Sequence, residues 1–377
     1  MRRRIFLASL AALGLAGTAS AEEATGEPVL IGVSGPLTGQ YAQYGAQWKR
    51  GFDLALDRAN AQGGVKGRKL AYAFEDSQSD PRQSVAIAQK FVGNPGVVME
   101  LGDFSSAASM AASPIYQRGG LVQFGFTNSH PDFTKGGDYM WSDAPNQADD
   151  MPHLAEYAIE RLGLKKLGIL YINGDWGRTS QELMLAAAKA RGATVVASEG
   201  YLPSEKDFRS TLVRLRDAAP DGIILIAYYP DGALIVRQMR DLGMTQKVVA
   251  AGSIYSPKFL EIAGDAANMG IFTDTNFFPE DPRAEAQEFI QGFKAKYGMD
   301  PDSYAARAYD AMVVAWWLAK TYGPDRQAIH DGLSAIKDIP SVIYGRMSFD
   351  PQSRRVAAPM SILLTVKDGK FTQWKGN

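Results

Sequence analysis

The sequence predicts an α/β protein of two doubly wound lobes, each with a parallel β-sheet covered by helices on both faces. Short apolar runs alternate with helical patterns from Val29 onward, which is typical of parallel sheets flanked by helices. The alternation comes in two series, and the second starts near Asp149. The chain of 377 residues also exceeds the size at which a single hydrophobic core usually keeps growing.

The first series begins with a strand and a helix that are separated by clear turn signals. Val29–Val33 is an apolar run, and the next helix has one apolar stripe that begins at Trp48 and stops before Gly63. Asp80 and Pro81 suit an N-cap and a first helical position, so another helix opens there. The other elements predicted in this series are strands at Leu70–Phe74, Val97–Leu101 and Leu121–Phe124 and a helix at Ala107–Arg118.

The second series repeats this order, and a third segment breaks it. Three helical patterns, over residues 281–297, 303–321 and 325–336, follow one another without a strand between them. Because helices alone cannot form a parallel sheet, we expect them to pack onto a lobe that is already built. The strands predicted in the second series and the tail are Leu167–Ile172, Thr194–Ala197, Ile223–Ala227, Val248–Ala251, Gly270–Phe272, Arg346–Phe349, Met360–Val366 and Phe371–Trp374.

The N-terminus has the three parts of a secretory signal peptide in their usual order. Arg2–Arg4 form a basic region, Ile5–Gly17 a short apolar region and Ala19–Ala21 an A-x-A cleavage site. We therefore expect cleavage after Ala21 and a periplasmic location. Removing residues 1–21, which hold three arginines and no acids, leaves 37 basic and 41 acidic residues. This slight excess of acidic residues is unlike the excess of Lys and Arg that is typical of nucleic-acid-binding proteins.

Several catalytic classes are excluded or weakened by the residue types present. The chain has no cysteine, and its three histidines lack metal-binding spacing, so we predict no disulfide, no metal and no cofactor. A phosphate-binding glycine loop and a GxSxG nucleophile motif are also absent from the sequence. A triad of Ser105 or Ser106 with His130 and Asp103 is conceivable for a secreted hydrolase.

Two serines at the start of the predicted Ala107–Arg118 helix form the first candidate site. Ser105 and Ser106 lie where a helix exposes backbone N–H groups that lack intrahelical partners. These N–H groups, the two hydroxyls and the positive end of the helix dipole suit a carboxylate. The alternative is that one serine only caps its own helix.

Loops at the carboxyl ends of the strands carry the next candidates, because ligands of open α/β sheets bind there. In the first lobe these loops hold hydroxyls, including Thr127 and Ser129, whereas in the second they hold aromatics, including Trp176 and Tyr228. Hydroxyls and N–H groups hold a polar head, and aromatic faces flank an apolar or planar body. The alternative is that loops in general are rich in polar and small residues.

Several motifs follow one another in a specific order along the mature chain, namely Ile31–Gly39, Tyr44-Gly45, Ala59–Gly67, Glu75-Asp76, Asp80-Pro81, Trp176-Gly177, Lys206–Phe208 and Gly345–Asp350. Their order and spacing resemble the Leu/Ile/Val-binding family of periplasmic solute-binding proteins. The resemblance implies two doubly wound lobes that are joined by three crossings, near Asn146, Asn276 and Asp350, and that close around a ligand. Lobe 1 would hold residues 28–146 and 277–350, and lobe 2 residues 147–276 and 351–377.

The resemblance also implies positions for the ligand contacts. Ser106 matches the residue that holds the ligand carboxylate through its hydroxyl and N–H, and Thr127 and Ser129 match the loop that completes this grip. The positions that match aromatic contacts are Tyr44 and Tyr304 on the first lobe and Trp176 and Tyr228 on the second.

One position departs from the family pattern. Amino-acid binders place an acid for the ligand ammonium where this chain has Gly252, and Asp103 near Ser106 is a candidate replacement. Because a buried ammonium without an anionic partner is costly, Gly252 favours a carboxylate without an ammonium, such as an aromatic acid. The acidic doublet Asp149-Asp150 is explained by a solvated turn.

The function implied by the resemblance is capture rather than catalysis. The protein would be the receptor of an ABC importer that binds a small carboxylate-bearing ligand, an aromatic acid or a branched-chain or other amino acid, and hands it to membrane permease subunits. Two alternatives stay open: a ligand-sensing periplasmic receptor for amides or related small molecules, and a secreted hydrolase.

Overall fold

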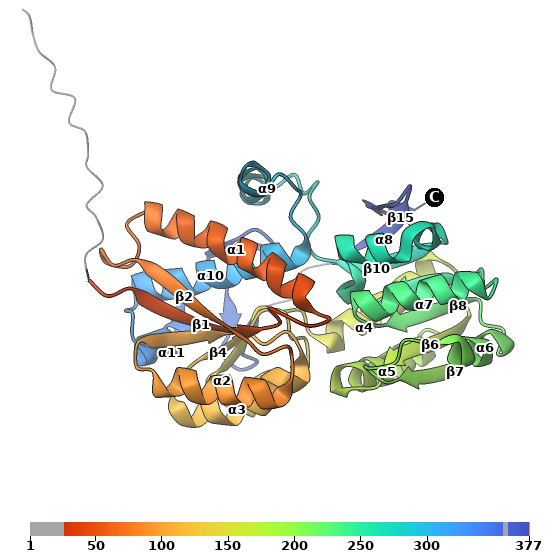
Figure 1. Ribbon diagram of the computed structural model, residues 1–377, viewed down its shortest axis with the longest axis horizontal. Coiled ribbons are helices and arrows are strands. Elements are labelled where there is room, and N and C mark those ends of the chain that lie inside the picture. Colours follow the sequence, from red (N-terminus) through yellow and green to blue (C-terminus); the bar gives the residue numbers. More distant parts are fainter. Residues whose placement is uncertain (1–25, 357–360, 377) are drawn as a thin grey trace, which may run out of the picture.

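The computed structural model describes residues 26–356 and 361–376 and has two lobes side by side, as Figure 1 shows. Each lobe is built around a seven-stranded sheet with helices on both faces. The strand orders are β13-β14-β5-β4-β3-β1-β2 and β16-β15-β10-β9-β8-β6-β7. Six neighbouring strands of the first sheet and five of the second are parallel, and antiparallel pairing occurs at one edge of each sheet. The predicted α/β class with two doubly wound lobes is therefore confirmed.

The first sheet contains the four strands predicted before residue 125, and it adds a strand at Met140–Ser142 that was not predicted. Predicted bounds at Val97–Leu101 agree with the observed strand, whereas the strand expected from Leu121 begins two residues later, at Gln123. The elements of this part of the chain are β1 (Val29–Gly35), α1 (Ala42–Ala61), β2 (Leu70–Asp76), α2 (Pro81–Gly93), β3 (Val97–Leu101), α3 (Ser106–Gly119), β4 (Gln123–Gly125) and β5 (Met140–Ser142).

The second sheet repeats the pattern and forms the other lobe. Its last parallel strand, β10, extends to Thr275 and not to the predicted end at Phe272. The elements here are α4 (Gln147–Glu156), which continues into a π-helical turn at Tyr157–Arg161, β6 (Lys166–Ile172), α5 (Asp175–Ala190), β7 (Thr194–Tyr201), α6 (Arg209–Asp217), β8 (Gly222–Ile226), α7 (Tyr229–Asp241), β9 (Lys247–Ala250), α8 (Pro257–Ala263) and β10 (Ile271–Thr275).

The three helices of the third segment return to the first lobe. Helix α10 packs along α1, where Gly51 allows close approach: a Cβ at Gly51 would lie 2.2 Å from the carbonyl oxygen of Ala305. The expectation that these helices pack onto an existing lobe is therefore confirmed. The elements are α9 (Ala284–Tyr297), α10 (Ser303–Thr321), α11 (Arg326–Ala335), β11 (Ile339–Ser341), β12 (Gly345–Met347), β13 (Phe349–Asp350), β14 (Arg355–Val356), β15 (Ile362–Lys367) and β16 (Lys370–Gln373).

The chain passes between the two sheets three times. The first passage follows β5 and the second follows β10, close to the predicted crossings near Asn146 and Asn276. The third was expected near Asp350, but β14 still pairs with β5 in the first sheet, so the first lobe extends past Asp350, and β15 belongs to the second sheet. The other residue boundaries of the two lobes stay a prediction.

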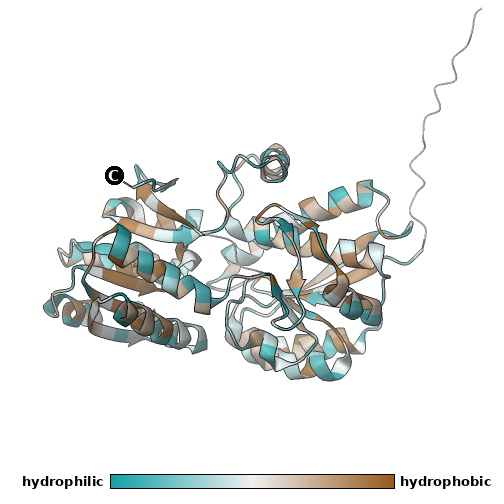
Figure 2. Ribbon diagram, turned by 180° about the vertical axis from the view of Figure 1, so that it is seen from behind, coloured by the Kyte–Doolittle hydropathy of each residue, from teal (hydrophilic) through white to brown (hydrophobic). Residues whose placement is uncertain are grey.

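Apolar residues concentrate in the strands at the centre of each lobe, as Figure 2 shows, with polar residues on the outer helix faces. Among the residues that the structure describes, no helix combines the length and the apolar character needed to cross a membrane. The predicted signal peptide, residues 1–21, lies outside the described residues.

Candidate ligand-binding site

A cavity lies between the two lobes and is lined by residues from both. It is bordered by the loops at the carboxyl ends of the strands, where doubly wound sheets place their ligand sites. Seven of the ten predicted site residues line it: Ser106, Thr127, Ser129, Trp176, Tyr228, Gly252 and Tyr304. The other three, Tyr44, Asp103 and Ser105, are not among the lining residues.

The first-lobe wall of the cavity carries hydroxyls and a helix N-terminus. Ser105 is the N-cap of α3, because its Oγ accepts a hydrogen bond from the N–H of Ala108 at 3.1 Å. Ser106, the first helical residue, is 2% exposed and faces the cavity. Thr127 Oγ1 is buried and has no hydrogen-bond partner within the described parts of the chain. Each serine therefore fits one of the two interpretations considered above: Ser105 caps the helix, and Ser106 lines the cavity.

The opposite wall is aromatic and comes from the second lobe. The rings of Trp176 and Tyr228 are stacked, with centroids 5.0 Å apart and an angle of 16° between the planes. Trp176 Nε1 donates a hydrogen bond to Ser129 Oγ across the lobes at 3.1 Å. Gly177 lets α5 start close to β6, because a Cβ there would lie 1.8 Å from the carbonyl oxygen of Ile172. This glycine therefore positions the indole next to it.

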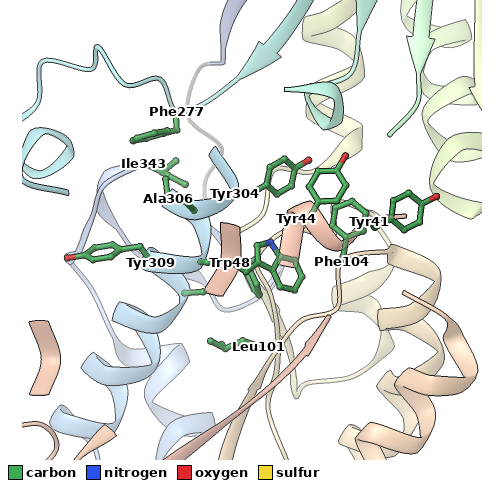
Figure 3. Packing of buried hydrophobic residues seen from close by; sticks show 14 of the residues in the cluster. Tyr41, Tyr44, Trp48, Leu101, Phe104, Phe277, Tyr304, Ala306, Tyr309 and Ile343 are labelled. Atoms are coloured by element: carbon green, nitrogen blue, oxygen red, sulfur yellow. The ribbon is translucent and has the colours of Figure 1, made fainter. Parts of the chain in front are cut away.

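Tyr44 has a different place from the one predicted. Its ring is 1% exposed and stacks on Phe104 at 4.1 Å, within a cluster that includes Tyr304 (Figure 3). Its hydroxyl donates to the carbonyl oxygen of Ser253 at 2.6 Å and accepts from the N–H of Tyr229 at 3.1 Å, and both of these groups belong to the second lobe. Tyr44 thus bridges the lobes behind the cavity instead of forming its wall.

Replacing Tyr44 with phenylalanine should weaken the apparent affinity for every ligand by a similar factor. The change removes two hydrogen bonds that join the lobes, each contributing about 0.5–1.5 kcal/mol. Because these bonds join the two lobes around the cavity, losing about 1–3 kcal/mol should raise dissociation constants roughly 5- to 160-fold. Isothermal titration calorimetry measures this change. Tyr72→Phe is the control, because the Tyr72 hydroxyl bonds Asp53 within the first lobe.

Asp103 is buried behind the cavity wall, so the suggestion that it meets a ligand ammonium is wrong. Its carboxylate accepts hydrogen bonds from Ser84 Oγ at 2.7 Å and from the N–H of Phe104 at 2.5 Å, and the side chain is 1% exposed. Burial raises the pKa of Asp103, and hydrogen bonds from serine hydroxyls oppose this. The carboxylate holds the turn that leads into α3.

The Ser-His-Asp triad that was conceivable from the sequence is not assembled. His130 Nε2 bonds Thr179 Oγ1 at 3.1 Å, and its Nδ1 accepts a hydrogen bond from the N–H of Asp132 at 3.1 Å. Both ring nitrogens therefore have partners outside the supposed triad. The Asp103 carboxylate is occupied by Ser84 and Phe104, as described above.

Charged residues that were not predicted also line the cavity. Asp150 and Asp274 contribute carboxylates, and the Arg307 guanidinium donates to Asn276 Oδ1 at 2.7 Å. Burial raises the pKa of Asp150 well above the usual range for aspartate. Asp150 therefore belongs to the cavity, and the interpretation of Asp149-Asp150 as only a solvated turn is wrong for its second member.

Each of these residues escaped the sequence for an identifiable reason. Asp274 lies within β10, two residues beyond the predicted strand end at Phe272, and the segment after this strand was not among the loops considered for the site. Asp150 lies in α4 and Arg307 in α10, and a helical pattern does not show whether a polar residue faces a cavity or solvent. The rule that ligands bind at the carboxyl ends of the strands would have included Asp274 if it had been applied to this strand.

The chain is similar to a large group of known binding proteins. A family model described as "Periplasmic binding protein" matches residues 28–370. A curated relative, the Leu/Ile/Val-binding protein homolog 1 of Brucella abortus (strain 2308), is 28% identical over 354 residues, which cover 93% of this chain and 92% of the relative.

Two solved structures extend the similarity to the fold. A putative branched-chain amino acid ABC transporter protein from Rhodospirillum rubrum is 33% identical, with a TM-score of 0.68 and coverage of 92% of this chain and 100% of that one. The branched-chain amino acid transporter substrate-binding protein LivJ from Streptococcus pneumoniae, solved with isoleucine, is 25% identical, with a TM-score of 0.85 and coverage of 92% and 98%.

Proposed function

Because this chain belongs to the periplasmic binding protein family, we propose that it captures a small carboxylate-bearing solute between its lobes and delivers it to the permease subunits of an ABC importer. It is a solute-binding protein of the ABC-transporter type. The amino acids and the aromatic acids are the candidate ligands. Export through the predicted signal peptide, cleaved after Ala21, is part of the proposal.

The observation that carries the proposal is the difference between the two walls of the interlobe cavity. One wall offers hydroxyls at Ser106 and Thr127 and the N-terminus of α3, which suit a carboxylate. The other offers the stacked rings of Trp176 and Tyr228, which suit an apolar or planar body. Support also comes from the Streptococcus relative, whose structure holds isoleucine.

The test is a panel of ligands that share or lack a carboxylate. We expect branched-chain amino acids or aromatic acids to raise the melting temperature of the purified protein, while the matching amides have no effect. A ligand at 100 times its dissociation constant should add about 2.7 kcal/mol to the free energy of unfolding. Stabilisation by amides but not by carboxylates would contradict the proposal and favour the receptor for amides.

Two neighbouring serines give this test a matched pair of variants. Ser106→Ala should weaken carboxylate binding roughly 10- to 160-fold, because it removes a hydrogen bond to a charged group, typically about 1.5–3 kcal/mol. Ser105→Ala should leave affinity unchanged but lower the free energy of unfolding by about 0.5–2 kcal/mol, because it removes the N-cap of α3. Calorimetric titration and urea unfolding separate the two effects. Equal affinity of Ser106→Ala and the parent protein would contradict the role given to Ser106.

A further inference from the structure

One corner of the cavity holds a buried acidic side chain, that of Asp274, with a carboxylate oxygen that is unpartnered within the described chain. Asp274 lies near the carboxyl end of β10 and is 6% exposed. Its Oδ1 atom is buried and finds no hydrogen-bond partner in residues 26–356 and 361–376. Because a buried carboxylate oxygen without a partner costs free energy, a group that is absent from the free protein is expected to bind it.

Gly252 and Asp274 share this corner. A Cβ at Gly252 would lie 2.7 Å from the carbonyl oxygen and 3.3 Å from Oδ1 of Asp274. The first distance is shorter than any ordinary contact, so a larger side chain at position 252 would displace Asp274. Asp274 of the neighbouring strand thus occupies the space beside Gly252, the position where amino-acid binders have an acid.

We propose that Asp274 binds an ammonium group of the ligand, so that the protein selects carboxylates that also carry an amino group. This inference rests on the proposed function, because it assumes that a carboxylate is captured at the first-lobe wall. It reverses the preference for ligands without an ammonium that Gly252 suggested in the sequence.

The charges around the corner favour a cation over a second anion. Asp150 and Asp274 both line the cavity, and the one cationic side chain among its lining residues, Arg307, is already bonded to Asn276 Oδ1 at 2.7 Å. Burial favours the neutral form of Asp150, so the negative charge of this corner rests on the Asp274 carboxylate. Ser106 and the α3 N-terminus provide the complementary end, so the cavity matches a zwitterion.

The ionisation of Asp274 makes this proposal sensitive to pH. Burial raises the pKa of Asp274 to about 6, while the charges of Arg307 and His153 act to lower it. Asp150 also faces this group and is itself influenced by Asp149 and Arg355. An ammonium binds the ionised carboxylate, so affinity for an amino acid should fall as the pH drops through 6. A pKa of about 6 implies a loss of roughly fourfold between pH 7.5 and pH 5.5.

The experiment compares ligands that differ only in the amino group. We would measure dissociation constants of L-leucine and 4-methylpentanoate, and of L-phenylalanine and 3-phenylpropanoate, by calorimetric titration. Asp274→Asn keeps the shape of the side chain. In the better-binding pair, it should raise the dissociation constant of the amino acid by roughly 30-fold or more, and change that of the acid without an amino group by less than threefold. Asp231→Asn is the control, because Asp231 is a buried acid of the second lobe that does not line the cavity.

The outcomes separate this inference from the proposed function. A preference for the amino member that disappears in Asp274→Asn, together with the loss of affinity for L-leucine at low pH in the unaltered protein, would support the ammonium site. Equal binding of both members of each pair, or equal weakening of both by Asp274→Asn, would overturn it while carboxylate capture stands. If neither member of any pair binds, and no other carboxylate of the panel does, the proposed function itself fails.

Discussion

Replacing Trp176 with alanine should weaken ligand binding by about 2–4 kcal/mol, or roughly 30- to 1,000-fold, which is the largest change in affinity that we expect from a single substitution. The indole stacks on Tyr228 at 5.0 Å and also donates a hydrogen bond to Ser129 Oγ of the other lobe. Its removal deletes one of the two rings of the aromatic wall and one of the bonds that join the lobes. Buried aromatic groups of this kind dominate binding energies because they exclude water from the contact.

The fold of the Trp176→Ala variant should be retained. Trp176 lies in the first turn of α5 and is only half-buried, whereas the core of the second lobe is formed by other residues. Trp176→Phe separates the two contributions, because it keeps a ring and loses the N–H that donates to Ser129. We expect this variant to fall between the parent protein and Trp176→Ala in affinity for the tightest-binding carboxylate of the panel.

A tryptophan outside the cavity provides the matched control. Trp317 is also half-buried, lies in α10 and does not line the interlobe cavity. Trp317→Ala should therefore bind the same carboxylate with unchanged affinity. If the dissociation constants of Trp176→Ala and Trp317→Ala agree within threefold, Trp176 does not contact the ligand, and the account of the aromatic wall is wrong.

Replacing Arg326 with methionine should lower the free energy of unfolding of the first lobe by about 2–4 kcal/mol. This is the largest loss of stability that we expect from a substitution of a partly exposed residue. Its guanidinium donates hydrogen bonds to five backbone carbonyl oxygens, those of Phe91, Val92, Asn94, Val97 and Gly119, at 2.8–3.3 Å. These carbonyls lie at the ends of α2 and α3 and at the start of β3.

The physical reason is that the last carbonyls of a helix lack intrahelical partners and carry partial negative charge. Arg326 supplies donors and a positive charge to two helix ends at once, and it attaches α11 of the third segment to the first sheet. Urea unfolding followed by tryptophan fluorescence measures the loss. Arg216→Met is the control, because Arg216 is exposed and its guanidinium bonds the side chain of the neighbouring Asp217. A stability equal to that of the control would contradict the role of Arg326.

The sequence predicted the hydroxyl-bearing and aromatic residues that line the cavity, but it did not predict the charged residues that line it. Ser106, Thr127, Ser129, Trp176 and Tyr228 were found because each follows a strand or opens a helix, and such positions face the ligand side of a doubly wound sheet. The prediction that they bind a ligand awaits the experiments above.

The orientations of two other predicted site residues are set by contacts that a local sequence pattern does not reveal. Tyr44 was predicted from its family position, but its hydroxyl is taken up by backbone groups of the other lobe, far away in sequence. Asp103 was chosen because it is near Ser106 in the chain, yet its carboxylate points to Ser84 behind the wall. Proximity in sequence is a poor guide to orientation, since one step along the backbone can turn a side chain from a cavity to a core.

The sequence by itself determined the fold class, the order of the helices and of the longer strands and the place of the third segment on an existing lobe, because these follow from hydrophobic periodicity and from helix and turn signals that act over a few residues. Three short strands, β5, β11 and β14, were not predicted. Only the tertiary structure decided which acid stands beside Gly252. Asp274, Asp150 and Arg307 come from a strand and two helices that are far apart in the chain. Their convergence results from how the two lobes pack together, and the charge that it creates depends on burial, which no single segment determines.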